Sequence, residues 1–232
     1  MRTIVGLCVV GLMALPAWAD SLGLPNEIPN PDFETGSLAP WTGNAEIHGQ
    51  NDFGVPSNGA STKWAGAITS WGGTWDGAYR TMRYVIDESQ YPGWDPSLNQ
   101  KEIDLQFDWF AAARSGDSWR NVGINVYLDW MDDGSYPDPA EPGYHKELVW
   151  GVSREADPNK WAGDWPWTHE TIRLVLPLQP RYLSIDVDFI VHFAEWSWVA
   201  IDNVDLEARC IPEPATLGLL ALGLPLLRRR RS

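Results

Sequence analysis

A strict alternation of apolar and polar residues is the feature that most limits how this chain can fold. From Val122 to Trp130 every second residue is apolar, and the residues between them are glycine or carry a polar group. The same alternation runs from Tyr182 to Phe193, where Ser184, Asp186 and Asp188 separate apolar positions. Successive side chains of a β-strand point to opposite faces, so a period of two over this length predicts strands buried on one face.

Shorter stretches with a β-type pattern divide the rest of the sequence. They span residues 79–86, 105–109, 146–152, 170–176 and 198–207. Glycine and proline separate them, and Asp76-Gly77 and Asp133-Gly134 are turn signals. No segment with a helical period competes with this pattern. Many antiparallel strands at such spacing predict an all-β fold, an antiparallel β-sandwich of the jelly-roll type.

The first nineteen residues have the three parts of a secretory signal peptide. Arg2 supplies a positive start, residues 4–15 are apolar, and Ala17-Trp18-Ala19 fits a small-x-small cleavage site. The alternative is a buried first strand or helix. We therefore expect residues 1–19 to be removed on export, and residues 20–210 to form a single folded domain.

The C-terminus, residues 211–232, combines three features in a fixed order. A Pro212-Glu213-Pro214 triplet comes first, and an uncharged run from Thr216 to Leu227 follows. The basic cluster after it consists of Arg228, Arg229, Arg230 and Arg231. This order resembles the PEP-CTERM sorting signal of Gram-negative bacteria. The resemblance implies export, transient membrane retention through a hydrophobic sorting helix, and processing by an exosortase-type enzyme. It also implies a place at the cell envelope, cell surface or extracellular matrix, in association with exopolysaccharide or biofilm.

The physical properties of the tail agree with this interpretation. Residues 215–227 are thirteen in number, which is short for a transmembrane helix of roughly 17–25 residues. Four arginines are expected to stay on the cytoplasmic side of the membrane. The alternative is an ordinary C-terminal membrane anchor.

Charge and cysteine content narrow the choice of partners. The net charge is −14, and removing Arg2 and the four tail arginines leaves 12 basic residues against 31 acidic ones. Such a surface repels nucleic acid and anionic lipid. Neutral sugars, divalent cations and basic partners remain compatible with it, as does plain solubility. Cys8 leaves with the signal peptide, so Cys210 cannot form an intramolecular disulfide.

Tryptophan is unusually frequent, with fifteen in the chain. Trp71, Trp75, Trp165 and Trp167 lie in stretches that contain glycine or proline, where loops are expected. Exposed indole rings offer an apolar plane with a polar edge and can stack on sugar rings. We predict that these four residues contact a ligand. The alternative is that they close the ends of the sandwich.

The two ends of the predicted domain share a second resemblance. The first end reads Asn30-Pro31-Asp32-Phe33-Glu34-Thr35-Gly36 with Trp41 after it, and the second reads Ile201-Asp202-Asn203-Val204. Together they resemble the galactose-binding-like jelly roll, a superfamily that includes many carbohydrate-binding modules. The resemblance implies that the first and last strands are neighbours and that Glu34 and Asp202 hold a structural Ca²⁺ with backbone carbonyls, the oxygen ligands that calcium prefers. The alternative is that Glu34 caps a turn and Asp202 accepts backbone hydrogen bonds.

Enzyme activity has little support in the sequence. Asp104, Asp108, Asp186 and Asp188 lie on the polar faces of predicted strands, and two carboxylates across one cleft can hydrolyse a glycosidic bond. Half-exposed sheets also carry such residues without any catalytic role. The histidines are scattered, and no nucleophile elbow or phosphate-binding loop occurs.

The predicted function is therefore an exported, non-catalytic polysaccharide-binding protein of the cell surface. One alternative is a structural protein of the matrix with protein partners only. A less favoured alternative is a glycoside hydrolase that uses the strand-face carboxylates.

Overall fold

The structure is a computed structural model that describes residues 25–49, 51–70, 78–91, 100–116, 121–176, 180–191 and 196–211. The predicted signal peptide and residues 212–232 of the predicted sorting tail lie outside these residues, as do Trp71 and Trp75.

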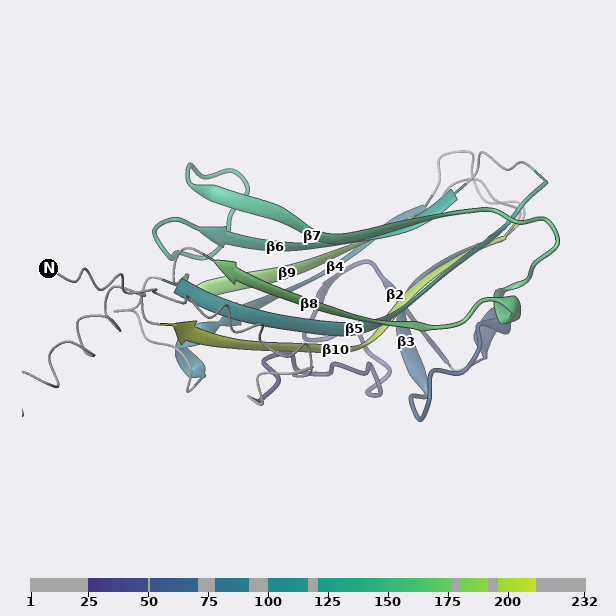
Figure 1. Ribbon diagram of the computed structural model, residues 1–232, viewed down its shortest axis with the longest axis horizontal. Coiled ribbons are helices and arrows are strands. Elements are labelled where there is room, and N and C mark those ends of the chain that lie inside the picture. The colour runs from purple at the N-terminus through teal and green to yellow at the C-terminus, as the bar shows by residue number, and fades with distance from the viewer. Residues whose placement is uncertain are drawn as a thin grey trace, which may run out of the picture.

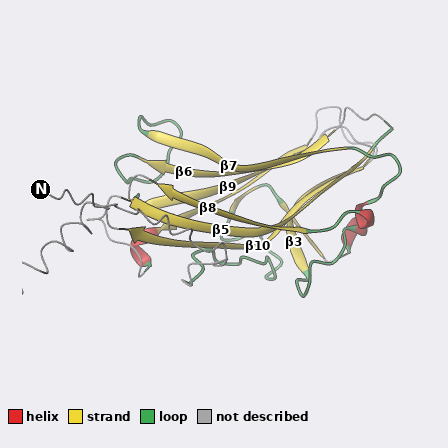
Figure 2. Cartoon of the chain, in the orientation of Figure 1, coloured by secondary structure: helices red, strands yellow, loops and turns green. Residues whose placement is uncertain are grey.

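Two antiparallel sheets of five strands each pack face to face as a β-sandwich, which confirms the predicted fold class (Figures 1 and 2). Sheet A has the order β1 (Thr42–Gly43), β4 (Ala78–Asp87), β9 (Tyr182–Val191), β6 (Asn121–Met131) and β7 (Tyr144–Glu155). Sheet B has the order β2 (Glu46–Gly49), β3 (Lys63–Ser70), β10 (Trp196–Ile211), β5 (Gln100–Arg114) and β8 (Thr168–Leu176). The described helical segments are three 3-10 turns, η1 (Asp52–Gly54), η2 (Glu88–Gln90) and η3 (Ala162–Asp164). Among the described residues no helix has the length and apolar character needed to cross a membrane.

All seven predicted strands are present, whereas the sequence pattern missed β1, β2 and β3. In β3 the reason is Gly66, which lies opposite Ala200 of β10. A Cβ atom at position 66 would lie 2.1 Å from the carbonyl oxygen of Val199, so only glycine allows this close approach. Glycine among alanines interrupts the apolar pattern from which a strand is recognised.

The main core lies between the sheets and is built from alternate residues of the central strands. Phe107, Ile124, Leu128 and Phe189 are completely buried there. Full burial of a large apolar side chain stabilises a protein by about 1.5–3 kcal/mol, so these alternating residues supply much of the stability of the sandwich.

A second apolar cluster covers the other side of sheet B, and we call it the outer aromatic cluster. Its buried members are Val55, Trp64, Phe110, Ala112, Ala162, Trp198 and Ala200. In β5 and β10 they alternate with main-core residues such as Trp109 and Val199. The segments around η1 and η3 fold back to cover them. The part of sheet B around Phe110 and Trp198 is thus apolar on both faces, in contrast to the outer face of sheet A.

Candidate functional site

The outer face of sheet A carries tyrosine, carboxylate, amide and basic side chains, and we call it the polar face. Its members are Tyr79 and Arg83 on β4, Asp186 and Asp188 on β9, Asn125, Tyr127 and Asp129 on β6, and Lys146 on β7. The register brings them together, because Arg83 and Tyr127 both lie opposite Asp186, and Asn125 lies opposite Asp188. The alternation that buries Ile185 and Leu128 in the core directs these side chains outward.

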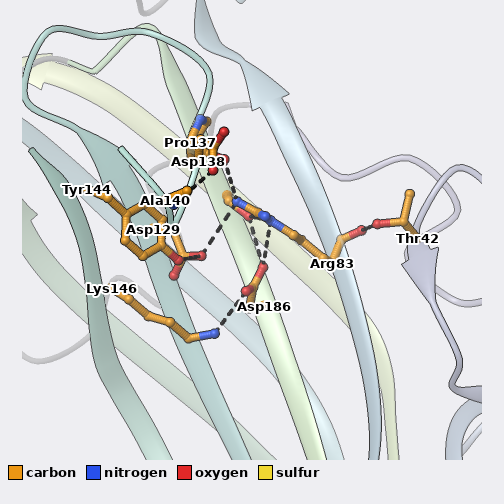
Figure 3. Close-up of polar contacts among 10 residues, drawn as sticks. Thr42, Arg83, Asp129, Pro137, Asp138, Ala140, Tyr144, Lys146 and Asp186 are labelled. Atoms are coloured by element: carbon orange, nitrogen blue, oxygen red, sulfur yellow. Dashed lines mark hydrogen bonds and ion pairs between the residues drawn. The ribbon is translucent and has the colours of Figure 1, made fainter. Parts of the chain in front are cut away.

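Arg83 joins three elements at one end of the polar face (Figure 3). Its Nε lies 3.1 Å from Oδ1 of Asp186 and donates to Oγ of Ser184 at 2.8 Å. Its Nη2 lies 3.6 Å from Oδ2 of Asp129 and donates to the carbonyl oxygen of Pro137 at 3.2 Å. Arg83 therefore contacts two carboxylates and also holds the loop between β6 and β7 against the sheet.

Asp129 is the most buried carboxylate of the polar face, with no exposed surface. The hydroxyl of Tyr144 donates to its Oδ2 at 2.6 Å. Burial is the largest influence on this carboxyl group and raises the pKa of Asp129 to about 6. A carboxylate without solvent access cannot reach a substrate, so Asp129 orders the site and does not do chemistry in it.

Asp186 and Tyr127 share the positive charge of Lys146. The Nζ atom of Lys146 donates to Oδ2 of Asp186 at 3.0 Å and lies 4.4 Å from the centroid of the Tyr127 ring. The Nδ2 group of Asn125 donates to the hydroxyl of Tyr127 at 3.3 Å. These contacts fix the orientation of an aromatic ring on a rigid sheet.

Asp188 and Tyr79 form the other part of the polar face. They are hydrogen-bonded, and burial followed by this bond raises the pKa of Tyr79. Tyr79 is nevertheless 55% exposed, whereas Asp188 is 8% exposed. The polar face thus offers exposed ring surface beside fixed hydrogen-bonding groups. Binding sites for polar ligands use this combination.

The four strand-face carboxylates do not share one surface. Asp104 and Asp108 belong to β5 in sheet B, whereas Asp186 and Asp188 belong to β9 in sheet A. The alternating pattern gives the face of a strand but not the sheet to which the strand belongs.

Asp108 has its own polar surroundings on sheet B. Its Oδ1 lies 2.8 Å from Nδ1 of His169, and its Oδ2 accepts from the side-chain amides of Asn58 at 2.9 Å and Asn203 at 2.8 Å. Asp104 is paired with Arg173 on the neighbouring strand β8. Both carboxylates are therefore engaged in contacts that join segments of sheet B.

Trp165 and Trp167 pack against the outer aromatic cluster. The ring of Trp165 has Arg154 4.5 Å and Lys160 4.2 Å from its centroid, and the indole N–H of Trp167 donates to the carbonyl oxygen of Pro56 at 2.8 Å. Both residues also line a shallow open depression with Pro56, Ser57, Gly163, Asp164 and Pro166. Their contacts are those expected of residues that close the sandwich, and their role in ligand binding stays a prediction.

Glu34 and Asp202 come together around one short segment, residues 58–63. The hydroxyl of Ser61 contacts both carboxylates. Glu34 also accepts from the backbone N–H groups of Thr62 and Lys63, and Asp202 accepts from Nδ2 of Asn58 at 2.9 Å. The two motif segments do meet, since the N–H of Val204 donates to the carbonyl oxygen of Pro31 at 2.9 Å, but the first strand β1 lies in sheet A and the last strand β10 lies in sheet B, so these two strands are not neighbours in one sheet.

The same contacts identify the oxygen donors that would be available to a calcium ion. The hydroxyls of Ser61 and Thr62 and the amide of Asn58 lie against the carboxylates, and each can turn an oxygen toward a cation. Asp202 is fully buried, and burial raises the pKa of its carboxyl group to about 6. Within the described residues no three His, Cys, Asp or Glu side chains gather around one point. The donors fit calcium through two carboxylates and neutral oxygens, and its binding stays a prediction.

Sequence reasoning found Asp186 and Asp188 of the polar face but missed the other members, which are Tyr79, Arg83, Asn125, Tyr127, Asp129 and Lys146. The alternation contained a signal for Tyr127, which shares the outward parity of Asn125 and Asp129 on β6. Nothing in the sequence placed Arg83 and Lys146 beside Asp186, because that contact depends on which strands are neighbours in sheet A.

No protein-family model and no curated protein matches the chain. Among solved structures, the carbohydrate-binding module TmCBM61 in complex with beta-1,4-galactotriose shares 15% identity at a TM-score of 0.46, over 79% of this chain and 98% of that one. A cyclase from Fischerella sp. TAU shares 16% identity at a TM-score of 0.45, over 81% and 97% of the two chains. The xylan-binding domain from CBM 22 shares 16% identity at a TM-score of 0.41, over 75% and 90%. One of these three proteins is an enzyme, and similarity of this degree does not extend to a ligand or an activity.

Proposed function

We propose that this protein is a non-catalytic polysaccharide-binding protein and that the polar face of sheet A holds the glycan. The observation that carries the proposal is the row of Tyr79, Asp188, Asn125 and Tyr127 across three neighbouring strands. Tyrosine rings offer apolar surface to the faces of sugar rings, and carboxylate and amide groups bond to hydroxyls. Because strands and cross-strand contacts fix these groups, little conformational entropy is lost on binding.

The electrostatics of the domain favour neutral or basic glycans over acidic ones. The excess of acidic residues repels polyanions. On the polar face itself, Arg83 and Lys146 are already paired with Asp129 and Asp186. No cation is therefore left on this face, among the described residues, to attract a uronate or sulfate group.

The chain ends complete the proposed function. Residues 1–19 would direct export, and residues 211–232 would retain the protein at the membrane until an exosortase-type enzyme processes it. Trp71, Trp75, Trp165 and Trp167 are proposed as additional ligand contacts.

We expect Tyr127→Ala and Asp188→Asn to weaken glycan binding by at least about tenfold, which corresponds to about 1.4 kcal/mol. The first change removes a ring whose position is already fixed, and the second removes a charged acceptor of hydroxyl hydrogen bonds. The measurement is affinity electrophoresis against neutral, acidic and amino polysaccharides, followed by titration of the glycan that retards the protein most.

Trp161→Ala is the matched control, because Trp161 is 49% exposed but lies beside the outer aromatic cluster of sheet B. Its binding should equal that of the unmodified protein, and equal melting temperatures would show that all variants fold. Loss of binding in Trp161→Ala alone would show that the glycan binds near Trp161 and not on the polar face. Absence of binding to every glycan would contradict the proposal and favour the structural matrix protein.

We also propose that Glu34 and Asp202 hold a structural calcium ion. An ion that binds only the folded state raises stability by about 2.7 kcal/mol at a hundredfold excess over its dissociation constant. We expect a higher melting temperature in calcium than in chelator, and we expect Glu34→Gln and Asp202→Asn to abolish this difference.

The control for calcium is Asp133→Asn, which changes an exposed aspartate in the loop of sheet A. Its calcium-dependent shift should match that of the unmodified protein. Equal melting temperatures in calcium and chelator for the unmodified protein would show that the two carboxylates only order the turn at residues 58–63.

A further inference from the structure

Two carboxylates and one lysine are buried together at one end of the sandwich. Glu27 lies in the segment before the first strand, Glu88 lies in η2, and Lys101 lies near the start of β5. Their exposed fractions are 2%, 1% and 1%. None of them belongs to the polar face or to the segment around Glu34 and Asp202.

The three side chains touch one another directly. The Nζ atom of Lys101 contacts Oε2 of Glu88, and the carboxyl groups of Glu27 and Glu88 share a hydrogen bond. Within the described residues, Oε2 of Glu27 and Oε1 of Glu88 are buried without a hydrogen-bond partner. Two carboxyl oxygens are thus left unsatisfied where no solvent reaches them.

The backbone around these side chains is held firmly. The N–H of Glu27 donates to the carbonyl oxygen of Leu206 at 2.8 Å, and the hydroxyl of Tyr91 donates to the carbonyl oxygen of Glu27 at 3.0 Å. The N–H of Glu88 donates to the carbonyl oxygen of Arg181 at 2.9 Å. The backbone segments that carry Glu27 and Glu88 are therefore anchored to their neighbours.

The charges of this cluster do not balance if both carboxyl groups are ionised. One lysine can balance one carboxylate, so a second buried carboxylate would be uncompensated. Burial, reinforced by the charge of Glu88, raises the pKa of Glu27 to about 9. Glu27 is accordingly a neutral acid at pH 7, and its proton lies next to the carboxyl group of Glu88.

We propose that Lys101 and Glu88 become joined by an amide bond between Nζ and Cδ, with Glu27 as the catalytic residue that transfers the proton. The cluster holds a primary amine in contact with a carboxyl group, beside a neutral acid and away from water. These are all the groups that the condensation needs.

The reaction requires no other reactant. One proton passes from Lys101 to the carboxylate of Glu88, which leaves a neutral amine and a neutral acid. The amine lone pair attacks Cδ, and Glu27 donates its proton to a departing carboxyl oxygen. The C–O bond breaks, one water molecule leaves, and Glu27 recovers a proton from the nitrogen. The ammonium and carboxylate have then become one amide and one water, and Glu27 is unchanged.

Proximity and burial make this condensation feasible without an external enzyme. Well-oriented intramolecular reactions reach effective molarities of about 10⁵–10⁸ M. Exclusion of water opposes the reverse hydrolysis. The product also removes the buried ion pair, whose desolvation opposes folding.

The test is peptide mapping of the full chain, purified folded and then denatured before digestion. We expect a branched peptide that joins Lys101 to Glu88 and is lighter by one water than the sum of its two parts. Processing at either end of the chain does not affect this result. Linear peptides with unmodified Lys101 and Glu88 would overturn the proposal, and a bond from Lys101 to Glu27 would overturn the assignment of the two carboxyl groups.

Two comparisons make the test specific. Glu27→Gln keeps the shape and neutrality of the side chain but cannot supply the proton, so the branched peptide should be lost, and its persistence would overturn the role of Glu27. Lys146 is the internal control, because its Nζ lies 3.0 Å from Asp186 while its side chain is 34% exposed. Peptides that contain Lys146 should remain linear. If Glu27→Gln does not fold, the map of the unmodified protein still decides whether the bond exists.

Discussion

Replacement of Trp198 by alanine is expected to lower the free energy of unfolding by about 3–5 kcal/mol, the usual cost of removing a buried aromatic ring. Trp198 is 1% exposed and stacks on Trp196 at 5.9 Å between ring centroids. Its loss would open a cavity between β10 and the covering loops, on the side of sheet B that faces away from the main core. Urea unfolding followed by circular dichroism measures this effect.

Trp161→Ala provides the comparison for this prediction. Trp161 contacts the ring of Trp198 from beside the outer aromatic cluster but is 49% exposed, with the Arg114 guanidinium 3.9 Å from its ring centroid. Its removal should cost about 1 kcal/mol or less, the range of an exposed cation–π contact. Equal losses in the two variants would show that the outer aromatic cluster is not packed as a second core.

Replacement of Arg83 by alanine is the second large effect that we expect, a loss of about 3 kcal/mol from breaking a buried ionic network. Asp129 would keep the hydroxyl of Tyr144 but lose the cation that balances it. The carbonyl oxygen of Pro137 would lose its donor as well, so the loop between β6 and β7 should become more accessible to proteases. Urea unfolding and limited proteolysis measure the two effects.

The pH dependence separates this charge effect from simple loss of packing. The folded-state pKa of Asp129, about 6, lies above its ordinary value. Protonation below that pH removes the charge that Arg83 balances, so the deficit of Arg83→Ala should be largest at neutral pH and smaller in mild acid. The control is Arg181→Ala, which breaks the more exposed pair with Asp87 and should cause a much smaller loss. A deficit in Arg83→Ala that does not change with pH would contradict the proposed charge balance.

The sequence predicted those parts of the structure that depend on one strand at a time. The alternation in β6 and β9 gave both the strands and the buried face, because burial on one side of a strand imposes a period of two. The contact of Arg83 and Lys146 with Asp186 depends on the order β4-β9-β6-β7, which local patterns do not contain. The pattern missed β3 for a similar reason. Glycine is needed at position 66 because the backbone of β10 lies so close, and a local pattern does not contain that contact.

The tryptophans illustrate the same limit for the candidate site. Glycine and proline around Trp165 and Trp167 correctly indicated a segment outside the strands. They did not show that this segment folds back on sheet B, because the apolar outer face formed by Phe110 and Trp198 becomes visible only when β5 and β10 are paired.

The position of β10 in the sheet determines how the domain would respond to mechanical tension. β10 is paired with β5 along nearly its whole length and with β3 over its first part, and the sequence continues from its last residue, Ile211, into the proposed tail. A pull through the tail would act along this central strand and load its hydrogen bonds together in shear, instead of peeling them apart singly. Resistance to force depends on the barrier to unfolding, and hydrogen bonds that are loaded together resist a pull better than bonds that break one at a time.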